Sequence, residues 1–252
     1  MMNEFTNDCR LIRQQSPIIH NITNYVAMNF SANALLAIGA SPLMSSEPEE
    51  MEEIAVEADA LVINIGCLER TQAEAMFRAA SVVHALGKPW VLDPAGVGLS
   101  RLRRATADRL VKEYSPALIR GNATEIMILS GADTKSRGLD SRHTTSEALE
   151  YASRLAVESG AVVAVSGATD YVTDGNRVEE ISGGSPMMAC VTAMGCTASA
   201  VAAAFLAVDD DAFAASVNAM TLMAAAGRKA AEKSVGPGSF AAQFIDCLYE
   251  RA

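Results

Sequence analysis

The chain has 252 residues, half of them hydrophobic, and we expect a single domain spanning residues 1–252 with a large buried core. Thirty acidic and twenty basic residues leave a net charge of −10 without a long Lys/Arg run, which argues against a nucleic-acid partner. Only 20% of the residues are charged, so we expect an apolar part of the surface to form a homo-oligomer interface.

The first half of the chain alternates apolar runs of strand length with segments of helical period. The runs are continuously apolar, as in strands of a parallel sheet that is covered on both faces. In chain order, this half predicts a strand at 17–20, a helix from the Ser46-x-x-Glu49 capping box to about residue 58, a strand at 60–65, a helix at 70–86, a strand at 89–92, a helix carrying Arg101, Arg103 and Arg104, and a strand at 117–119.

The second half continues this alternation and ends in helices. Residues 131–143 are rich in Gly, Asp, Lys and Arg and are expected to form a surface loop. The other elements are a helix from the Thr144-x-x-Glu147 capping box to about residue 159, a strand at 161–165, a hairpin of 170–173 and 177–181 around Asp174-Gly175-Asn176, and helices near 195–207, 210–233 and 239–250. The whole pattern predicts βαβ units and a doubly wound α/β sheet.

Cysteine usage and hydropathy indicate a cytoplasmic protein. The number of cysteines is odd and no CxxC or metal-type spacing occurs, which predicts reduced thiols. Residues 1–13 lack the apolar run of a signal peptide. The uncharged stretch 181–208 raises the alternative of a membrane span, but its Gly, Pro and small polar residues and its acidic flanks favour a buried loop and a core helix. We therefore expect no membrane partner.

The segment Thr192-Ala193-Met194-Gly195-Cys196 leads into an Ala-rich helix and is the strongest candidate for a ligand site. Small residues at a helix N-terminus allow main-chain amides to bind an anion. Cys196 would lie in the first turn, where the pKa of a thiol is lowered. The alternative is a helix packed in the core with Cys196 as an inert filler.

Polar residues also follow several predicted strands, where ligands bind in open α/β sheets. Asp93 precedes two glycines and could approach phosphates and a metal, or could simply cap a turn. Asn122-x-x-Glu125 reads as a capping box, while Glu125 could also order Mg²⁺ through water. Ser166 follows the strand at 161–165 and could line a nucleotide pocket.

Three further polar segments can be explained by structural roles alone. Residues 20–24 and 41–46 are expected to be loops at strand ends, with His20 a satisfied core residue and Met44 packing material. Residues 236–239 are expected to form a turn in which Ser239 caps the last helix.

Taken together and in this order, the motifs resemble the 4-methyl-5-(2-hydroxyethyl)thiazole kinases of thiamine biosynthesis and salvage, in the ribokinase-like superfamily. The resemblance implies a three-layer αβα sandwich around a mostly parallel sheet, and a homotrimer with active sites at the subunit interfaces. The matching stretches are HNITNYVAMN (20–29), GASPLM (39–44), INIG (63–66), LDPAGVG (92–98), IRGNATEI (119–126), Gly195-Cys196 and GPGSF (236–240).

The resemblance also implies roles in binding Mg²⁺ and ATP. Asp93 and Glu125 correspond to the acids that organise Mg²⁺. Arg120, Asn122 and Ser166 correspond to the positions that bind ATP.

On the substrate side, the resemblance places Asn21 and Met44 against the thiazole alcohol, together with Gly195 and the position of Ala193. Cys196 corresponds to the catalytic position that most ribokinase-like enzymes fill with Asp. The family usually has Gly-Thr-Gly-Cys or Gly-Ala-Gly-Cys, whereas this chain has Ala193-Met194-Gly195-Cys196. Because Ala193 replaces a glycine, it does not easily take a positive φ, which leaves the substrate and the rate open.

These features predict in-line transfer of the γ-phosphoryl group of ATP to a primary hydroxyl that Cys196 orients. Three alternatives remain: an ATP-dependent dehydratase or another small-alcohol kinase of the same fold, a non-catalytic thiazole or nucleotide binder, and a Cys–His hydrolase. The hydrolase would pair Cys196 with one of three histidines, namely His20, His84 and His143.

Overall fold

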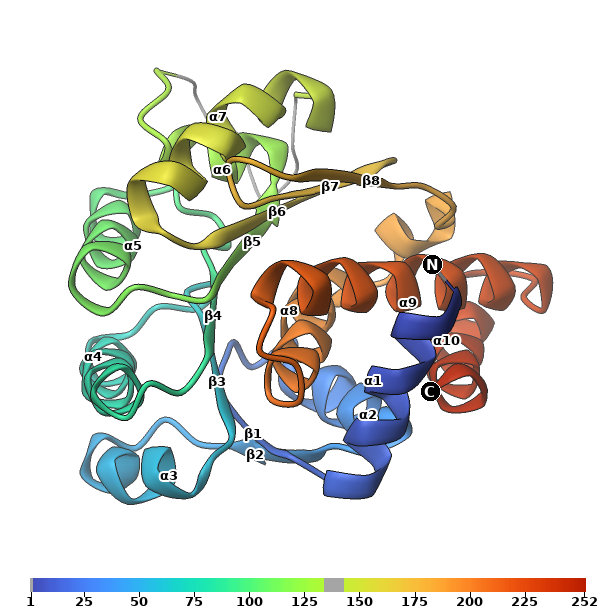
Figure 1. Ribbon diagram of the computed structural model, residues 1–252, viewed down its shortest axis with the longest axis horizontal. Coiled ribbons are helices and arrows are strands. Elements are labelled where there is room, and N and C mark those ends of the chain that lie inside the picture. Colours follow the sequence, from blue (N-terminus) through green and yellow to red (C-terminus); the bar gives the residue numbers. More distant parts are fainter. Residues whose placement is uncertain (1, 134–142) are drawn as a thin grey trace.

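The computed structural model describes residues 2–133 and 143–252, with side chains described from residue 7. Within these residues an eight-stranded sheet has the order β2-β1-β3-β4-β5-β6-β7-β8 and is covered by helices on both faces (Figure 1). Strands β1 to β6 pair in parallel, whereas β7 and β8 form an antiparallel hairpin at one edge. The predicted three-layer αβα architecture with a mostly parallel sheet is confirmed.

Apart from β2, the strands lie where the sequence predicted them, with ends shifted by at most three residues. The shift matters because it brings polar residues such as Asp93 into the last position of a strand. The strands are β1 (Ile18–Ile22), β2 (Ser41–Met44), β3 (Ala60–Asn64), β4 (Trp90–Asp93), β5 (Leu118–Asn122), β6 (Val162–Ser166), β7 (Asp170–Thr173) and β8 (Val178–Ile181).

The helices form two layers, each packed on its own apolar cluster. One layer contains α3 (Met51–Glu57), α4 (Arg70–Ala85), α5 (Arg101–Tyr114), α6 (Ala123–Leu129) and α7 (Thr145–Ser159). The other layer contains α1 (Met2–Gln15), α2 (Met28–Ile38), α8 (Met194–Leu206), α9 (Ala212–Glu232) and α10 (Pro237–Arg251). Two 3-10 helices, Pro48–Glu50 and Pro186–Cys190, lie in loops.

Side chains of each strand alternate between these two clusters. We call the apolar cluster that contains the buried residues of α8 the α8 cluster, and the one that contains those of α4 the α4 cluster. In β4, for example, Val91 belongs to the α8 cluster, whereas its neighbours Trp90 and Leu92 belong to the α4 cluster. Burial on both faces explains why these strands read as continuous apolar runs. The capping box at Thr144 is confirmed, with the Thr144 hydroxyl accepting from Glu147 N and the carboxylate of Glu147 accepting from Thr144 N.

Part of the predicted loop at 41–46 is wrong, because Ser41–Met44 form the edge strand β2, paired in parallel with β1. Pro42 hid this strand, yet proline is tolerated at a sheet edge, where one side of the strand needs no donor. The two helices before and after β1, α1 and α2, were not predicted. The N-terminal part of α2 lies in the motif 20–29, which carries few charges and no strong cap.

Two predicted helix starts are also wrong. Ser46 does not cap a helix, because Pro48 begins a 3-10 turn and α3 then starts at Met51. Ser239 is not the N-cap of α10 but the third residue of its first turn, where its hydroxyl accepts from Gly236 N at 3.3 Å. The prediction had Ser239 as the residue before the helix. Instead, Ser239 lies inside the first turn and its side chain bonds back to the N-cap residue, Gly236.

No helix in the described part of the chain is long and apolar enough to cross a membrane. The uncharged stretch instead contains a 3-10 turn and the buried helix α8, as its Gly and small residues predicted. Most of the predicted loop at 131–143, residues 134–142, lies outside the described residues.

Candidate functional site

Five strands of the sheet carry a polar side chain at or near their C-terminal end, on the face that packs against α8. They alternate in register with the apolar residues of the α8 cluster, and Asn64 pairs directly with Asp93 across β3 and β4. Since parallel strands end at one edge, these groups gather above the N-terminus of α8. They are Asn21, Asn64, Asp93, Arg120 and Ser166.

The centre of this row lies where the direction of the strand order reverses. β1 is followed in sequence by β2 on one side, while β3 pairs with its other side, so β1 and β3 flank a topological switch point. Asn24 after β1 and Asn64 at the end of β3 meet here, with Asn24 Nδ2 3.0 Å from Asn64 Oδ1. Both amides donate to Cys196 Sγ, at 3.3 and 3.2 Å.

The expected lowering of the Cys196 thiol pKa is wrong. Burial and the nearby charge of Asp93 raise the pKa to about 12, and these effects outweigh the lowering by the two amide donors and by the charge of Arg120. Cys196 is therefore a neutral thiol at physiological pH. His20 bonds to the Ser45 carbonyl at 3.1 Å through Nε2 and is not bonded to Cys196. The expectation that His20 is a satisfied core residue is wrong in part, because its buried Nδ1 has no hydrogen-bond partner among the described residues.

The N-terminus of α8 begins at an alanine in a left-handed conformation. Ala193 has φ 69° and ψ 0°, the region that the sequence led us to regard as difficult for any residue but glycine. The first-turn amides have no intrahelical acceptor, and an alanine side chain cannot cap them. The start of α8 therefore has no side-chain cap, and its left-handed alanine carries backbone strain.

Ala193→Gly is expected to stabilise the protein by about 0.5–1 kcal/mol, because relief of the left-handed strain exceeds the extra chain entropy of glycine. For a chain of this size, this raises Tm by about 1–3 °C in a thermal melt. The matched control is Ala207→Gly at the other end of α8, where φ is −72° and glycine should lower Tm. An unchanged or lower Tm for Ala193→Gly would contradict the inference that the left-handed backbone of Ala193 is strained.

Position 195 leaves little room for a side chain, because the guanidinium of Arg120 lies against Gly195. A Cβ at this position would be 2.6 Å from Arg120 Nη1, a distance at which one of the two groups must move. Among the described residues, Arg120 Nε is buried and has no hydrogen-bond partner. The guanidinium and the first turn of α8 together form a corner suited to a phosphate group.

The turn after β6 borders this corner. Ser166 Oγ is buried and lacks a hydrogen-bond partner in the described part of the chain. Asp170 accepts from Gly167 N at 2.8 Å, and burial raises its carboxyl pKa to about 6 in spite of the charge on Arg120. A Cβ on Gly167 would lie 2.7 Å from Thr145 Cγ2, so a larger residue there would require a shift. The turn thus places the Asp170 carboxyl within the electrostatic influence of Arg120, next to Ser166.

Asp93 is a buried acid at the centre of the row. Its Oδ2 accepts from Ser199 Oγ of α8 at 2.8 Å, and its neighbours include Asn64 and the Ala95 amide. Burial raises the pKa of its carboxyl above the ordinary value, against the charge of Arg120. Asp93 is more than a turn cap, since its side chain faces α8.

Glu125 closes the predicted capping box and also reaches a second loop. Its Oε2 accepts from Asn122 N and its Oε1 from Gly96 N, each at 2.9 Å, while Asn122 Oδ1 accepts from Glu125 N. Burial, and then the charge of Asp93, raise the pKa of Glu125 to about 7. Glu125 can therefore close the capping box and still lie beside Asp93, where the sequence placed a possible role in ordering Mg²⁺.

Asp93→Asn is expected to lower the pKa of Glu125, because it removes the charge of Asp93 that raises it. With a folded-state pKa of about 7 above the ordinary 4.5, Glu125 favours folding fully below about pH 4.5 and loses this effect as pH rises through 7. A carboxyl NMR titration measures the change. Asp170, whose shift does not involve Asp93, is the internal control. A Glu125 titration unchanged in Asp93→Asn would contradict the coupling.

Asn21 and Met44 are direct neighbours across β1 and β2. Asn21 is buried and donates to the Ile19 carbonyl at 2.8 Å, while its Oδ1 has no hydrogen-bond partner among the described residues. Met44 is half-buried at the end of the edge strand. The structure thus brings together the two residues that the resemblance placed on the substrate side, with a buried acceptor on Asn21 that no described group satisfies.

Three residues in this region were not predicted from the sequence as site residues. Asn24 and Asn64 lie in the matching stretches 20–29 and 63–66, so their position after apolar strands was the available signal. Ser199 lay inside an Ala-rich helix and carried no signal, because only its helical position toward β4 brings it to Asp93.

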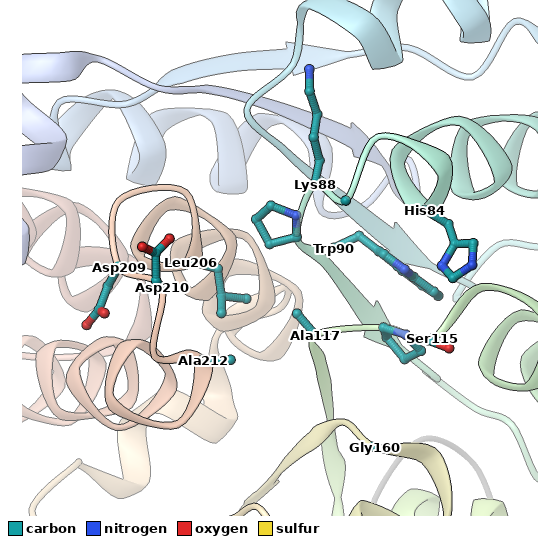
Figure 2. A pocket seen from close by; sticks show the side chains of 13 residues that line it. His84, Lys88, Trp90, Ser115, Ala117, Gly160, Leu206, Asp209, Asp210 and Ala212 are labelled. Atoms are coloured by element: carbon teal, nitrogen blue, oxygen red, sulfur yellow. The ribbon is translucent and has the colours of Figure 1, made fainter.

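A pocket of about 370 Å³ lies at the opposite edge of the sheet (Figure 2). It is lined where strands begin, at Trp90 and Ala117, and where α8 ends, at Asp209 and Asp210. Lys88 Nζ bonds to the Ala58 carbonyl at 2.7 Å instead of reaching into the pocket. Of the candidate residues only His84, named for the hydrolase alternative, lines it, and none of those predicted to bind substrate, ATP or Mg²⁺ does, so we assign the pocket no role in the chemistry.

The sheet order and the two helix layers define a ribokinase-like α/β fold. The whole architecture is similar to that of a ribokinase-like superfamily protein from Enterococcus faecalis, with a TM-score of 0.68 at 15% identity over 95% of this chain and 89% of that one.

The model of the hydroxyethylthiazole kinase family matches residues 9–251, and the chain belongs to this family. It is 48% identical to a hydroxyethylthiazole kinase from Brachyspira hyodysenteriae over 250 residues, 99% of this chain and 94% of that protein. A hydroxyethylthiazole kinase from Pyrococcus horikoshii has a similar structure, with a TM-score of 0.89 at 38% identity, covering 98% of this chain and 92% of the other.

Proposed function

We propose that the protein transfers the γ-phosphoryl group of ATP to the primary hydroxyl of 4-methyl-5-(2-hydroxyethyl)thiazole, a step of thiamine biosynthesis and salvage. The observation that carries the proposal is the corner in which the Arg120 guanidinium lies against Gly195 at the open start of α8. Family membership supports the acceptor, since the relatives are hydroxyethylthiazole kinases. In this proposal, Asn21 and Met44 hold the thiazole beside Ala193 and Gly195.

The nucleotide side of the proposal rests on groups that lack partners in the described part of the chain. Arg120 Nε and Ser166 Oγ are buried donors whose hydrogen-bonding capacity a phosphate or ribose would satisfy. Asn122 differs from them, because its Oδ1 already caps α6, but it ends β5 two residues after Arg120 and is in register with Ser166. We assign Arg120, Asn122 and Ser166 to ATP.

The acids fit Mg²⁺. Asp93 and Glu125 are buried, their pKa values are both raised, and each would be stabilised as a carboxylate by a nearby dication. Because both Glu125 oxygens already accept main-chain N–H groups, Glu125 would act through metal-bound water, and Mg²⁺ keeps such waters. When bound, Mg²⁺ neutralises charge on the β- and γ-phosphates.

Cys196 orients the acceptor in this proposal and does not act as a strong base. With a pKa of about 12 the thiol stays neutral, and the amides of Asn24 and Asn64 fix its sulfur. A loose phosphoryl-transfer transition state does not require early removal of the hydroxyl proton. The amides of the first turn of α8 and Arg120 stabilise the charge on the transferred group.

Cys196→Ser is expected to lower kcat by about 10-fold, less than the ~10²–10⁴-fold that loss of a true general base costs. Cys196→Asp should retain kcat to within about 10-fold, because the two amide donors that now face sulfur would bind a carboxylate. Steady-state kinetics with MgATP measures both. Complete loss of turnover in a folded Cys196→Asp variant would contradict this role.

The function is tested by a coupled ATP assay against a panel of small primary alcohols, including hydroxyethylthiazole and hydroxymethylpyrimidine. Turnover with a phosphorylated thiazole product supports the proposal. Release of phosphate without a phosphorylated product would support a dehydratase instead, and nucleotide binding without turnover a non-catalytic binder. Reaction of the pyrimidine alone would overturn the acceptor and keep the kinase.

The proposal includes a homotrimer whose active sites lie at subunit interfaces. Exposed apolar residues beside Asn24 and on α2 support it, since Tyr25, Val26 and Leu36 are each about 60% exposed in one chain. A cytoplasmic location is supported by the five free cysteines. Light scattering on the purified protein tests the trimer.

A further inference from the structure

Arg103 of α5 connects the two loops that carry the centre of the site. Its Nη1 donates to the carbonyls of Ile65 and Ala95 at 2.8 and 2.7 Å, and its Nη2 donates to the Gly66 carbonyl at 2.7 Å. The Ser100 hydroxyl accepts from Arg103 N and so caps the helix that presents the side chain. The guanidinium forms no ion pair with any described residue.

Each loop leads directly to a group of the site. Gly66, whose carbonyl binds Arg103, donates its own N–H to Asn64 Oδ1 at 2.8 Å, and Asn64 donates to Cys196. In the other loop the Ala95 amide bonds to Asp93. A single guanidinium therefore fixes the loop that orients Asn64 relative to the loop that orients Asp93.

We infer that Arg103 is a positioning residue for phosphoryl transfer, which sets the spacing between the Asn64–Cys196 pair and the Asp93–Glu125 pair. It does not touch the reacting groups and acts through main-chain carbonyls. A planar guanidinium can span acceptors from two loops, whereas the single ammonium of lysine cannot reach them in the same geometry. This inference rests on the proposed function for its kinetic effect, but the connection between the loops does not.

Arg104 is the matched control. It is the next residue on α5, is also half-buried, and also donates to main-chain carbonyls, those of Ile128 and Leu129 at the end of α6. It differs in pairing with Asp108 and in touching neither loop of the site. Substitutions at either arginine thus remove hydrogen bonds to main-chain carbonyls, but only those at Arg103 remove them from the loops of the site.

The test compares Arg103→Lys, Arg103→Ala, Arg104→Lys and Arg104→Ala. We expect kcat to fall about 10-fold in Arg103→Lys and about 100-fold in Arg103→Ala, with changes below about 3-fold in the Arg104 variants. Added guanidinium at millimolar concentration should restore part of the activity of Arg103→Ala, with urea as the inert comparison. If Arg103→Ala does not fold, Arg103→Lys carries the kinetic test.

Amide hydrogen exchange provides the readout that needs no turnover. The Gly66 and Gly96 amides, bonded to Asn64 and Glu125, should exchange faster in the Arg103 variants than in the wild type or the Arg104 variants. Equal exchange and equal kcat at both arginines, or wild-type values in Arg103→Ala, would overturn the inference. If the wild type shows no kinase activity but amide exchange in both loops is still faster in the Arg103 variants, the proposed function is overturned. The connection of the two loops by Arg103 then stands.

Discussion

Asp93→Asn is expected to lower kcat by ~10²–10³-fold while changing the KM for the thiazole little, because Asp93 acts on charge that develops during transfer. The substitution keeps the shape of the side chain, and the Ser199 hydroxyl can still donate to the asparagine oxygen. What is lost is a negative charge at the centre of the site, beside Glu125 and Arg120.

Steady-state kinetics with MgATP and a thermal melt of the same protein measure this effect. The matched control is Asp108→Asn, which removes an exposed acid paired with Arg104 on α5 and should leave kcat unchanged. A kcat for Asp93→Asn within about 10-fold of the wild type would remove Asp93 from the proposed metal-organising role. A rise in KM with unchanged kcat would assign it to substrate binding instead.

Gly195→Ala is expected to lower kcat/KM by at least about 100-fold, because the new methyl group would meet Arg120 Nη1 at 2.6 Å. Because the guanidinium is the end of a flexible side chain, we expect it to move away from the start of α8, and the corner proposed for the phosphate is then lost. Gly238→Ala is the matched control, since a Cβ there, also in the first turn of a helix, meets nothing within 4 Å.

A double-mutant cycle shows whether the effect passes through Arg120. In the Arg120→Ala background, the added Gly195→Ala substitution should cost little, because the group that the methyl displaces is already gone. If the two effects multiplied instead, the methyl would act by blocking the main-chain amides of α8, and Arg120 would contribute separately. Either kinetic pattern is readable from kcat/KM for the four proteins.

Local sequence signals predicted most of the scaffold. Continuous apolar runs at 60–65 and 161–165 became buried strands because both faces of a parallel sheet are covered. The capping boxes at Asn122 and Thr144 formed as predicted, since each depends only on residues three apart. Ser46-x-x-Glu49 did not, because Pro48 starts a 3-10 turn inside the motif.

The candidate site could be predicted only in part. Asp93, Arg120 and Ser166 stand after or within recognisable strands, and the family resemblance gave them expected roles. The contact of Asn24 and Asn64 with Cys196 joins residues far apart in sequence, and no local pattern announces it. The next turn of α8 likewise brings Ser199 to Asp93 only once the helix has docked on β4.

The sequence by itself determined the alternation of strands and helices, the capping boxes, and the polar residues at the strand ends, because these depend on near neighbours and on periodicity. Only the tertiary structure decided the left-handed Ala193, the raised pKa of Cys196 and the bridging of two loops by Arg103. Burial and nearby charge govern the Cys196 pKa, and contacts between segments far apart in sequence govern the Arg103 bridge. Both exist only after the chain has packed. A helix N-terminus alone predicted a reactive thiol, and the packing around it made that thiol neutral.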